Sequence, residues 1–192
     1  KSTLNAKNLE ALGTERLAQL LIEISTGDAA AKRKLRLALA GAEGPREAAR
    51  EITKRLTSIA KARTFVNWQN RKPLVKDLQT QRSAIMDEIA PHDPGEALAL
   101  LWRFMGLATP VFERCDDSSG TVIDIFHQAC ADLGEVAKAA DAAPEALARQ
   151  LLDALQDNGF GQYDGLIAII TPALGPEGVA HLKGLVEEVG RT

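Results

Sequence analysis

The chain has 192 residues, of which 45% are apolar and 26% charged, and its formal net charge at pH 7 is −3. This length suffices for one hydrophobic core, while the composition excludes a disordered tail, a collagen-like repeat and a disulfide-stabilised scaffold. No uncharged apolar run reaches the roughly 18 residues of a membrane-spanning helix, so no membrane association is expected. Two cysteines are too few to cross-link the fold, which favours a reducing, cytoplasmic setting.

The first predicted helix begins at Thr14, a preferred N-cap residue, and stops at Gly27. Its apolar side chains recur at i, i+3, i+4 and i+7: Leu17, Leu20, Leu21 and Ile24. Asp28 is predicted to cap a second helix that ends at Gly41. Pro45 suits the first position of a third helix, because a helix has no partner for an N–H there. The stripe of this third helix consists of Ala49, Ile52, Leu56, Ile59 and Ala60.

A fourth stripe, which Pro91 closes, occupies the middle of the chain: Leu74, Leu78, Ile85 and Ile89. The next helix opens at Asp93 and is apolar on nearly every side as far as Leu107, which predicts a central, buried position. Pro172 must end or kink its helix, because proline lacks the donor that a helix interior needs. The remaining helices are predicted to end at the following residues: Gly134, Asn158, Pro172 and Gly190.

No run of residues shows the alternation of a strand, so the sequence predicts an all-α fold. About nine to eleven helices with short connections suit stacked antiparallel pairs, an α-α superhelix or solenoid similar to tetratricopeptide or HEAT arrays; a closed bundle is the alternative. One internal echo favours the stack, because Glu-Ala-Leu-Ala recurs at an offset of 49, in Glu96–Ala99 and Glu145–Ala148. We expect residues 1–192 to form one continuous helical domain, with any internal boundary near residues 91–95.

Three segments of the second half of the chain carry a family resemblance: Trp102–Met105, Val111–Gly120 and Asn158–Leu166. They resemble segments of an uncharacterised family of bacterial, mainly proteobacterial, proteins whose members are typically longer and α-helical repeat-like. The resemblance covers most of residues 9 to 190. It implies a helical-repeat architecture and a fragment of a longer chain, which agrees with a first residue, Lys1, that is not Met. It implies no activity, substrate or catalytic residue.

The charges are distributed unevenly along the sequence. Residues 32–82 contain 14 Lys and Arg against 4 Asp and Glu, a net charge of +10. Residues 83–192 contain 6 basic and 18 acidic side chains, a net charge of −12. Like charges in one segment repel one another, so the basic segment is expected to face solvent, an acidic protein partner or a nucleic acid.

A nucleic-acid interface would use the basic segment 46–76, in which two aromatics, Phe65 and Trp68, lie among basic residues. Single-strand binders stack bases on such rings, although a core plug at a helix end is the simpler interpretation of this pair. Any such affinity would be weak, non-specific and steeply dependent on salt. The candidate nucleic-acid-binding residues are Arg50, Lys54, Lys61, Arg63, Arg71 and Lys72.

The sequence contains no phosphate-binding Gly-rich loop, no nucleophile elbow and no His-Glu-x-x-His pair. Cys115, His127 and Cys130 could join an aspartate in a zinc site, but an inert buried thiol is the ordinary interpretation of Cys130. The neighbouring Asp116 and Asp117 are predicted to cap the following helix; acid/base chemistry or cation binding by this pair is the alternative. No metal and no cofactor are expected.

Arg103 is the one charge between Ala97 and Leu107 of the apolar helix, and it is predicted to order the 113–120 turn through Asp117 or Glu113. The leading functional expectation is a non-enzymatic scaffold that binds a protein or peptide on a concave helical face. A nucleic-acid-associated protein is the first alternative, and an enzyme with a site near the 116–117 pair is the second. The candidate partner-binding residues are Trp68, Arg71, Arg103, Asp116, Asp117 and Tyr163.

Overall fold

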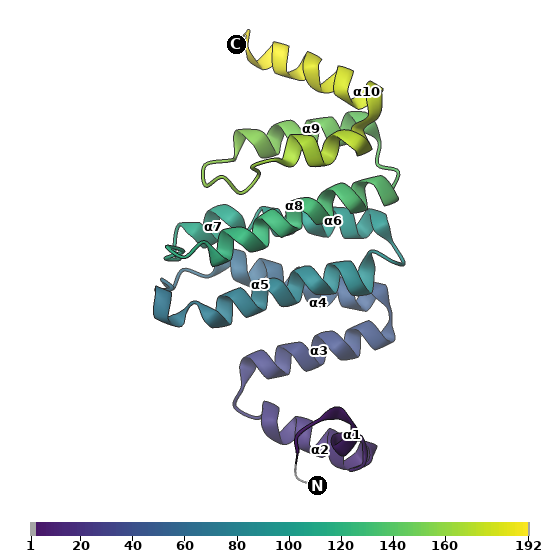
Figure 1. Cartoon of the computed structure of the whole chain (residues 1–192), viewed down its shortest axis with the longest axis vertical. Coiled ribbons are helices and arrows are strands. Elements are labelled where there is room, and N and C mark those ends of the chain that lie inside the picture. The colour runs from purple at the N-terminus through teal and green to yellow at the C-terminus, as the bar shows by residue number, and fades with distance from the viewer. Residues whose placement is uncertain (1–2, 192) are drawn as a thin grey trace.

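The computed structural model describes residues 3–191, and these fold into helices that follow one another along the long axis of the molecule (Figure 1). The predicted all-α fold is confirmed for these residues, which contain no strand and only an isolated bridge between Val66 and Cys115. The elements are α1 (Ala6–Glu10), α2 (Thr14–Ser25), α3 (Ala29–Glu43), α4 (Pro45–Lys61), η1 (Trp68–Asn70), α5 (Lys72–Ala84), η2 (Ile85–Ile89), α6 (Pro94–Met105), α7 (Ala108–Phe112), α8 (Thr121–Ala139), α9 (Pro144–Gln156) and α10 (Leu166–Val189).

Most helices begin where local sequence signals place them. The Asp28 carboxylate accepts hydrogen bonds from the N–H groups of Ala30 and Ala31 and so caps α3. Pro45 is the first residue of α4, and the Asp93 side chain accepts from the Glu96 N–H at the start of α6. Thr14 is instead the first residue of α2 rather than its cap, because Gly13 occupies the N-cap position.

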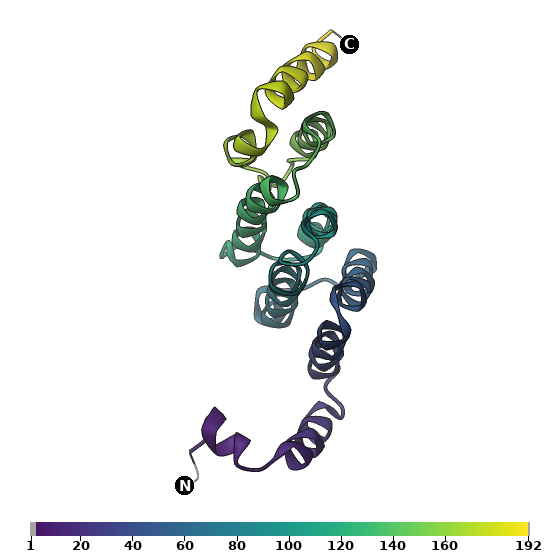
Figure 2. The same cartoon turned by 90° about the vertical axis from the view of Figure 1, so that its right-hand side faces the viewer.

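The hydrophobic core lies where α6 and α8 pack against each other, with α4 and α5 on one side and α10 on the other. Phe104 of α6 and Phe126 of α8 are fully buried, and their ring centroids are 5.5 Å apart. The central position predicted for the helix after Asp93 is therefore confirmed. One cluster of buried side chains extends from Ala48 to Leu174 and crosses residues 91–95. Figure 2 shows the same helices stacked in two staggered columns.

α3 continues two residues past the predicted end at Gly41, and two other helix ends differ more from the sequence prediction. α8 continues through Gly134 to Ala139, and α10 continues through Pro172. The break in α10 lies at Gly175, whose φ of 61° belongs to the left-handed region that glycine tolerates. Gly134 serves packing instead, because a Cβ added there would lie 2.5 Å from Ile169 Cγ2 and 2.9 Å from the Ile169 carbonyl oxygen. Glycine thus lets α8 and α10 approach closely.

The helices α1 and α2, at the N-terminal end of the molecule, bury few side chains. α2 contacts mainly α3 and α1, and its only buried residue is Ser25. The apolar stripe predicted to face a core is largely uncovered here, since Ile24 is 68% exposed and Leu21 is 48% exposed. None of the helices among the described residues combines the length and the apolar character that crossing a membrane requires.

We predict that Gly134→Ala lowers the free energy of unfolding by about 1–3 kcal/mol, because the Ile169 side chain and backbone must both move to admit the methyl group. Gly184→Ala in α10 is the matched control. A Cβ there meets no heavy atom within 4 Å, so this variant should gain about 0.5–1 kcal/mol. Urea denaturation followed by circular dichroism measures both changes, and equal stability of the two variants would contradict the close approach at Gly134.

Candidate binding surface

The loop between α4 and α5 is fastened to the turn that precedes α8. The Val66 N–H donates to the Arg114 carbonyl oxygen at 2.7 Å, and the Asp116 N–H donates back to the Val66 carbonyl oxygen at 2.9 Å. Arg71 reinforces this pairing, because its Nη1 donates to the Asp116 carbonyl oxygen at 2.8 Å and lies 3.5 Å from Asp117 Oδ1. Since the Arg71 side chain is largely buried, it supports the fold rather than facing a partner or a phosphate.

Asp117 caps α8 through both carboxylate oxygens. Its Oδ1 and Oδ2 accept from the Val122 N–H, and Oδ2 also accepts from the Ile123 N–H at 2.8 Å. Asp116 accepts from the Ser118 N–H, and this hydrogen bond holds the pKa of the Asp116 carboxyl below its usual value. The predicted capping interpretation is confirmed for Asp117. A general acid near neutral pH needs a raised pKa, which is the opposite of what Asp116 has.

Two other candidate partner-binding residues, Arg103 and Tyr163, are held by contacts within the fold. The prediction that Arg103 orders the 113–120 turn is wrong, because its Nη2 donates instead to Thr57 Oγ1 of α4 at 2.8 Å and Arg71 takes that role. Tyr163 is only 5% exposed and lies among the buried residues of the core cluster. Burial, the largest cause, raises the pKa of Tyr163 to about 12. Tyr163 therefore does not line an accessible groove.

The residues weighed for a zinc site contact the loop before α10. His127 Nε2 lies 2.9 Å from the Gly161 carbonyl oxygen, and the Cys130 thiol donates to the Gln162 carbonyl oxygen at 3.3 Å. Burial raises the pKa of Cys130 to about 12, so this thiol stays protonated at neutral pH. No cluster of three or more potential metal-binding side chains occurs within residues 3–191.

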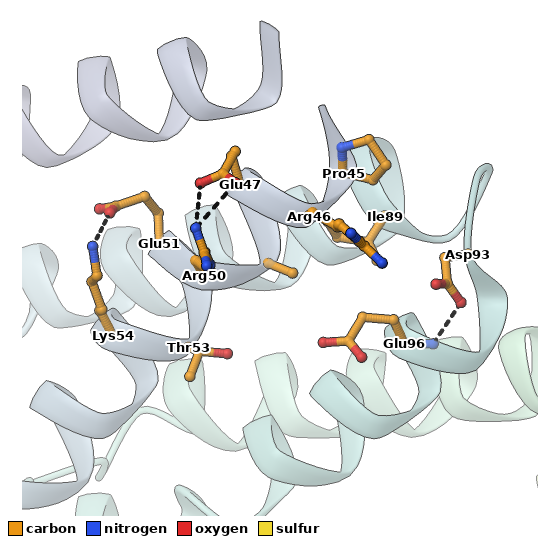
Figure 3. A pocket seen from close by; sticks show the side chains of 11 residues that line it. Pro45, Arg46, Glu47, Arg50, Glu51, Thr53, Lys54, Ile89, Asp93 and Glu96 are labelled. Carbon is orange, nitrogen blue, oxygen red and sulfur yellow. Dashed lines mark hydrogen bonds and ion pairs between the residues drawn. The ribbon is translucent and has the colours of Figure 1, made fainter. Parts of the chain in front are cut away.

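Cations on α4 line a groove of about 860 Å³ between α4 and α6, shown in Figure 3. Arg50 Nη1 lies 3.2 Å from Glu47 Oε1, and Lys54 Nζ lies 2.5 Å from Glu51 Oε1. Both acids come three residues before their partners, so each pair spans one turn of the same helix. These two candidate nucleic-acid-binding residues are thus already matched by acids.

Four cations that form no ion pair within residues 3–191 surround a second concave site, between α3 and α5. A hollow of about 490 Å³ lies between α3 and α5, and Arg33, Lys34, Lys72 and Lys76 line it. None of these four forms an ion pair with an acid of the described chain. Asp28, which also lines the hollow, has a pKa lowered chiefly by its hydrogen bonds to Ala31 and Ala30, with smaller contributions from Lys76 and Arg33. The hollow therefore carries an excess of positive charge.

The second acid that lines this hollow, Asp77, is neutralised by Arg55 of α4. Arg55 Nε of α4 donates to Asp77 Oδ2 at 2.7 Å, and both side chains are largely buried. A buried acid that already has a cation as its partner offers little attraction to the exposed lysines around it. The Arg55–Asp77 ion pair thus leaves Asp28 as the only acid among the described residues of the lining that has no cation partner.

The exposed aromatic side chain of Trp68 lies beside this basic hollow. A second hollow of about 800 Å³ shares Lys72 and Lys76 with the first and is also lined by Trp68. Trp68 is 63% exposed and Phe65 is 65% exposed, so the interpretation of this pair as a core plug is wrong. An apolar ring in solvent beside cations without ion pairs, such as that of Trp68, is typical of a surface that contacts a ligand.

The family model for the Family of unknown function (DUF6880) matches residues 1–192. The chain belongs to this family. No curated protein and no solved structure matches this DUF6880 member. The resemblance in the second half of the chain is confirmed to the extent that the chain is a member of a family of unknown function.

The candidate nucleic-acid-binding residues of this DUF6880 member do not share one hollow. Arg50 lines the groove beside α6, Lys72 lines the hollow beside α3, and Arg71 holds the turn before α8. The acids one turn before Arg50 and Lys54 are a signal in the sequence that could have excluded those two cations. The residues that sequence reasoning missed as site residues are Arg33, Lys34, Lys76 and Gln81.

In this DUF6880 member we predict that Asp117→Ala lowers the free energy of unfolding by about 2–4 kcal/mol, because it removes the cap of α8 and leaves Arg71 buried without its acid. Asp116→Ala is the control and should change stability by less than about 1 kcal/mol, since it loses one exposed hydrogen bond. Thermal unfolding measures both variants. An effect of Asp116→Ala as large as that of Asp117→Ala would contradict the assigned roles.

Proposed function

We propose that the protein is a non-enzymatic scaffold of stacked antiparallel helix pairs, of the helical-repeat type, that binds an acidic segment of a partner protein. The binding site is the hollow between α3 and α5. Elongated stacks of helices present extended surfaces on which a partner segment can lie. In this proposal α6 and α8 supply the rigid core, while α3 and α5 supply the side chains that touch the partner.

The observation that carries the proposal is a set of four cations, from two different helices, around one hollow. None of the four forms an ion pair among the described residues, and Asp28 is the one acid of the lining without a cation partner of its own. Arg33 and Lys34 come from α3, and Lys72 and Lys76 come from α5. Bringing like charges together costs free energy that a bound polyanionic segment would recover. Facing charges of opposite sign also accelerate encounter and reject basic partners. The side chains are therefore arranged for an acidic ligand.

The size of the site suits a short piece of chain. The hollow of about 490 Å³ lies within the range of sites that take small ligands or a few residues of peptide. The second hollow, with Trp68, continues from it across Lys72 and Lys76. A segment with acids followed by an apolar or aromatic residue would place the acids over the lysines and the apolar group against the indole ring.

The test uses a fluorescein-labelled octaglutamate peptide and fluorescence anisotropy. We expect the wild-type chain to bind this probe and Lys72→Glu/Lys76→Glu to bind it at least about tenfold more weakly, because two attractive charges become repulsive. The affinity should fall as salt shortens the range of the charges. The control, Lys138→Glu/Lys183→Glu, changes net charge equally at two exposed lysines outside the hollow and should bind like wild type. The proposal is overturned if the control loses as much affinity, or if wild type does not bind.

A nucleic-acid-associated function is the second candidate, and the exposure of Phe65 and Trp68 favours it. Bases stack on such rings with about 1–3 kcal/mol each, and nearby Lys61 and Arg63 would follow the phosphates. We expect a mobility shift with a single-stranded oligonucleotide at low salt, weakened about five- to a hundredfold by Trp68→Ala. No shift at micromolar protein would eliminate this candidate.

A further inference from the structure

The basic hollow contains a buried acceptor without a donor and a buried donor without an acceptor. Gln81 of α5 is only 4% exposed, and its Oε1 has no hydrogen-bond partner. Arg33 of α3 has a buried Nε that also lacks a partner. Both side chains line the hollow between α3 and α5 and a smaller neighbouring hollow of about 240 Å³. Such groups destabilise a folded chain unless something pairs with them.

The Arg55–Asp77 ion pair fixes the direction of the Gln81 amide. Gln81 Nε2 lies 3.5 Å from Asp77 Oδ1, while Asp77 Oδ2 accepts from Arg55. Turning the amide over would bring its oxygen toward a carboxylate, which repels it. The carbonyl oxygen of Gln81 is therefore kept pointing away from Asp77, as a buried acceptor without a donor.

We propose that the acidic partner segment is bound as an extended peptide whose main chain pairs with these two side chains. One peptide N–H donates to Gln81 Oε1, and one peptide carbonyl accepts from Arg33 Nε. This inference rests on the proposed function and adds main-chain recognition to charge recognition. α3 packs mainly on α4 and only marginally on α5, so side chains along the seam between α3 and α5 can shift to admit the peptide.

The need for a donor separates a peptide from other polyanions. A phosphate or carboxylate polymer brings only acceptors, which can satisfy Arg33 but leave Gln81 unpaired. A peptide backbone supplies both a donor and an acceptor at each residue, which are the two kinds of group that Gln81 and Arg33 lack. Acidic side chains of the same peptide reach Lys34, Lys72 and Lys76, so one ligand matches every unpaired group of the hollow.

The experiment is a double-mutant cycle in which one change is made at Gln81 of the protein and the other at the backbone amides of the peptide. Labelled octaglutamate is compared with a backbone N-methylated octaglutamate, which keeps the charges but has no amide donors. Each probe is titrated into wild type and into Gln81→Met, which keeps the length of the side chain and removes its acceptor. We expect wild type to prefer the unmethylated probe by about 2- to 10-fold more than Gln81→Met does. Gln150→Met, at an exposed glutamine of α9, should keep the wild-type preference.

The outcomes separate this inference from the proposed function. If both probes bind wild type and Gln81→Met with the same ratio, the backbone is not recognised, although charge recognition stands. If neither probe binds wild type, the proposed function itself fails. Thermal unfolding of Gln81→Met guards against a folding defect. Its midpoint should stay close to that of wild type, because the variant loses the weak contact with Asp77 but no longer buries an unpaired acceptor.

Discussion

The ion pair between Arg55 of α4 and Asp77 of α5 neutralises the acid of α5 that lies among the cations of the basic hollow. Asp77 is the only acid within α5, and Arg55 holds it below the surface of the hollow. The lysines on either side of the hollow form no ion pair with Asp77, and the Gln81 amide receives a fixed direction. The positive charge of the hollow and its unpaired acceptor thus follow from one contact between two helices.

The local parts of the fold could be predicted from the sequence because their causes act over a few residues. Asp28 and Asp93 cap the helices that follow them, and Pro45 opens α4, as their residue types require. The apolar surface of the helix after Asp93 was sufficient to predict its central position. The predicted helix end at Gly134 is wrong, because the sequence does not distinguish a glycine that ends a helix from a glycine that lets a neighbouring helix approach.

The sequence predicted a basic region but not which of its cations line the hollow between α3 and α5. Arg71 and Asp117 lie far apart in the chain, so neither residue reveals that one neutralises the other. The same holds for Arg82 of α5 and Asp132 of α8, which form a bidentate pair with distances of 2.6 and 3.0 Å. Which cations stay unpaired depends on such contacts between helices. Exposure of Trp68 likewise depends on how the loop before α5 is fastened, which composition does not encode.

The order of the helices in space has a consequence for how this molecule meets others. Because the elements succeed one another along the long axis, the change of sign along the sequence becomes a separation of charge along the molecule (Figure 1). The protein therefore carries a permanent electric dipole directed along its length. In dilute salt the field of such a dipole steers approaching anions toward the basic end of the molecule and approaching cations toward the acidic end, before any contact forms.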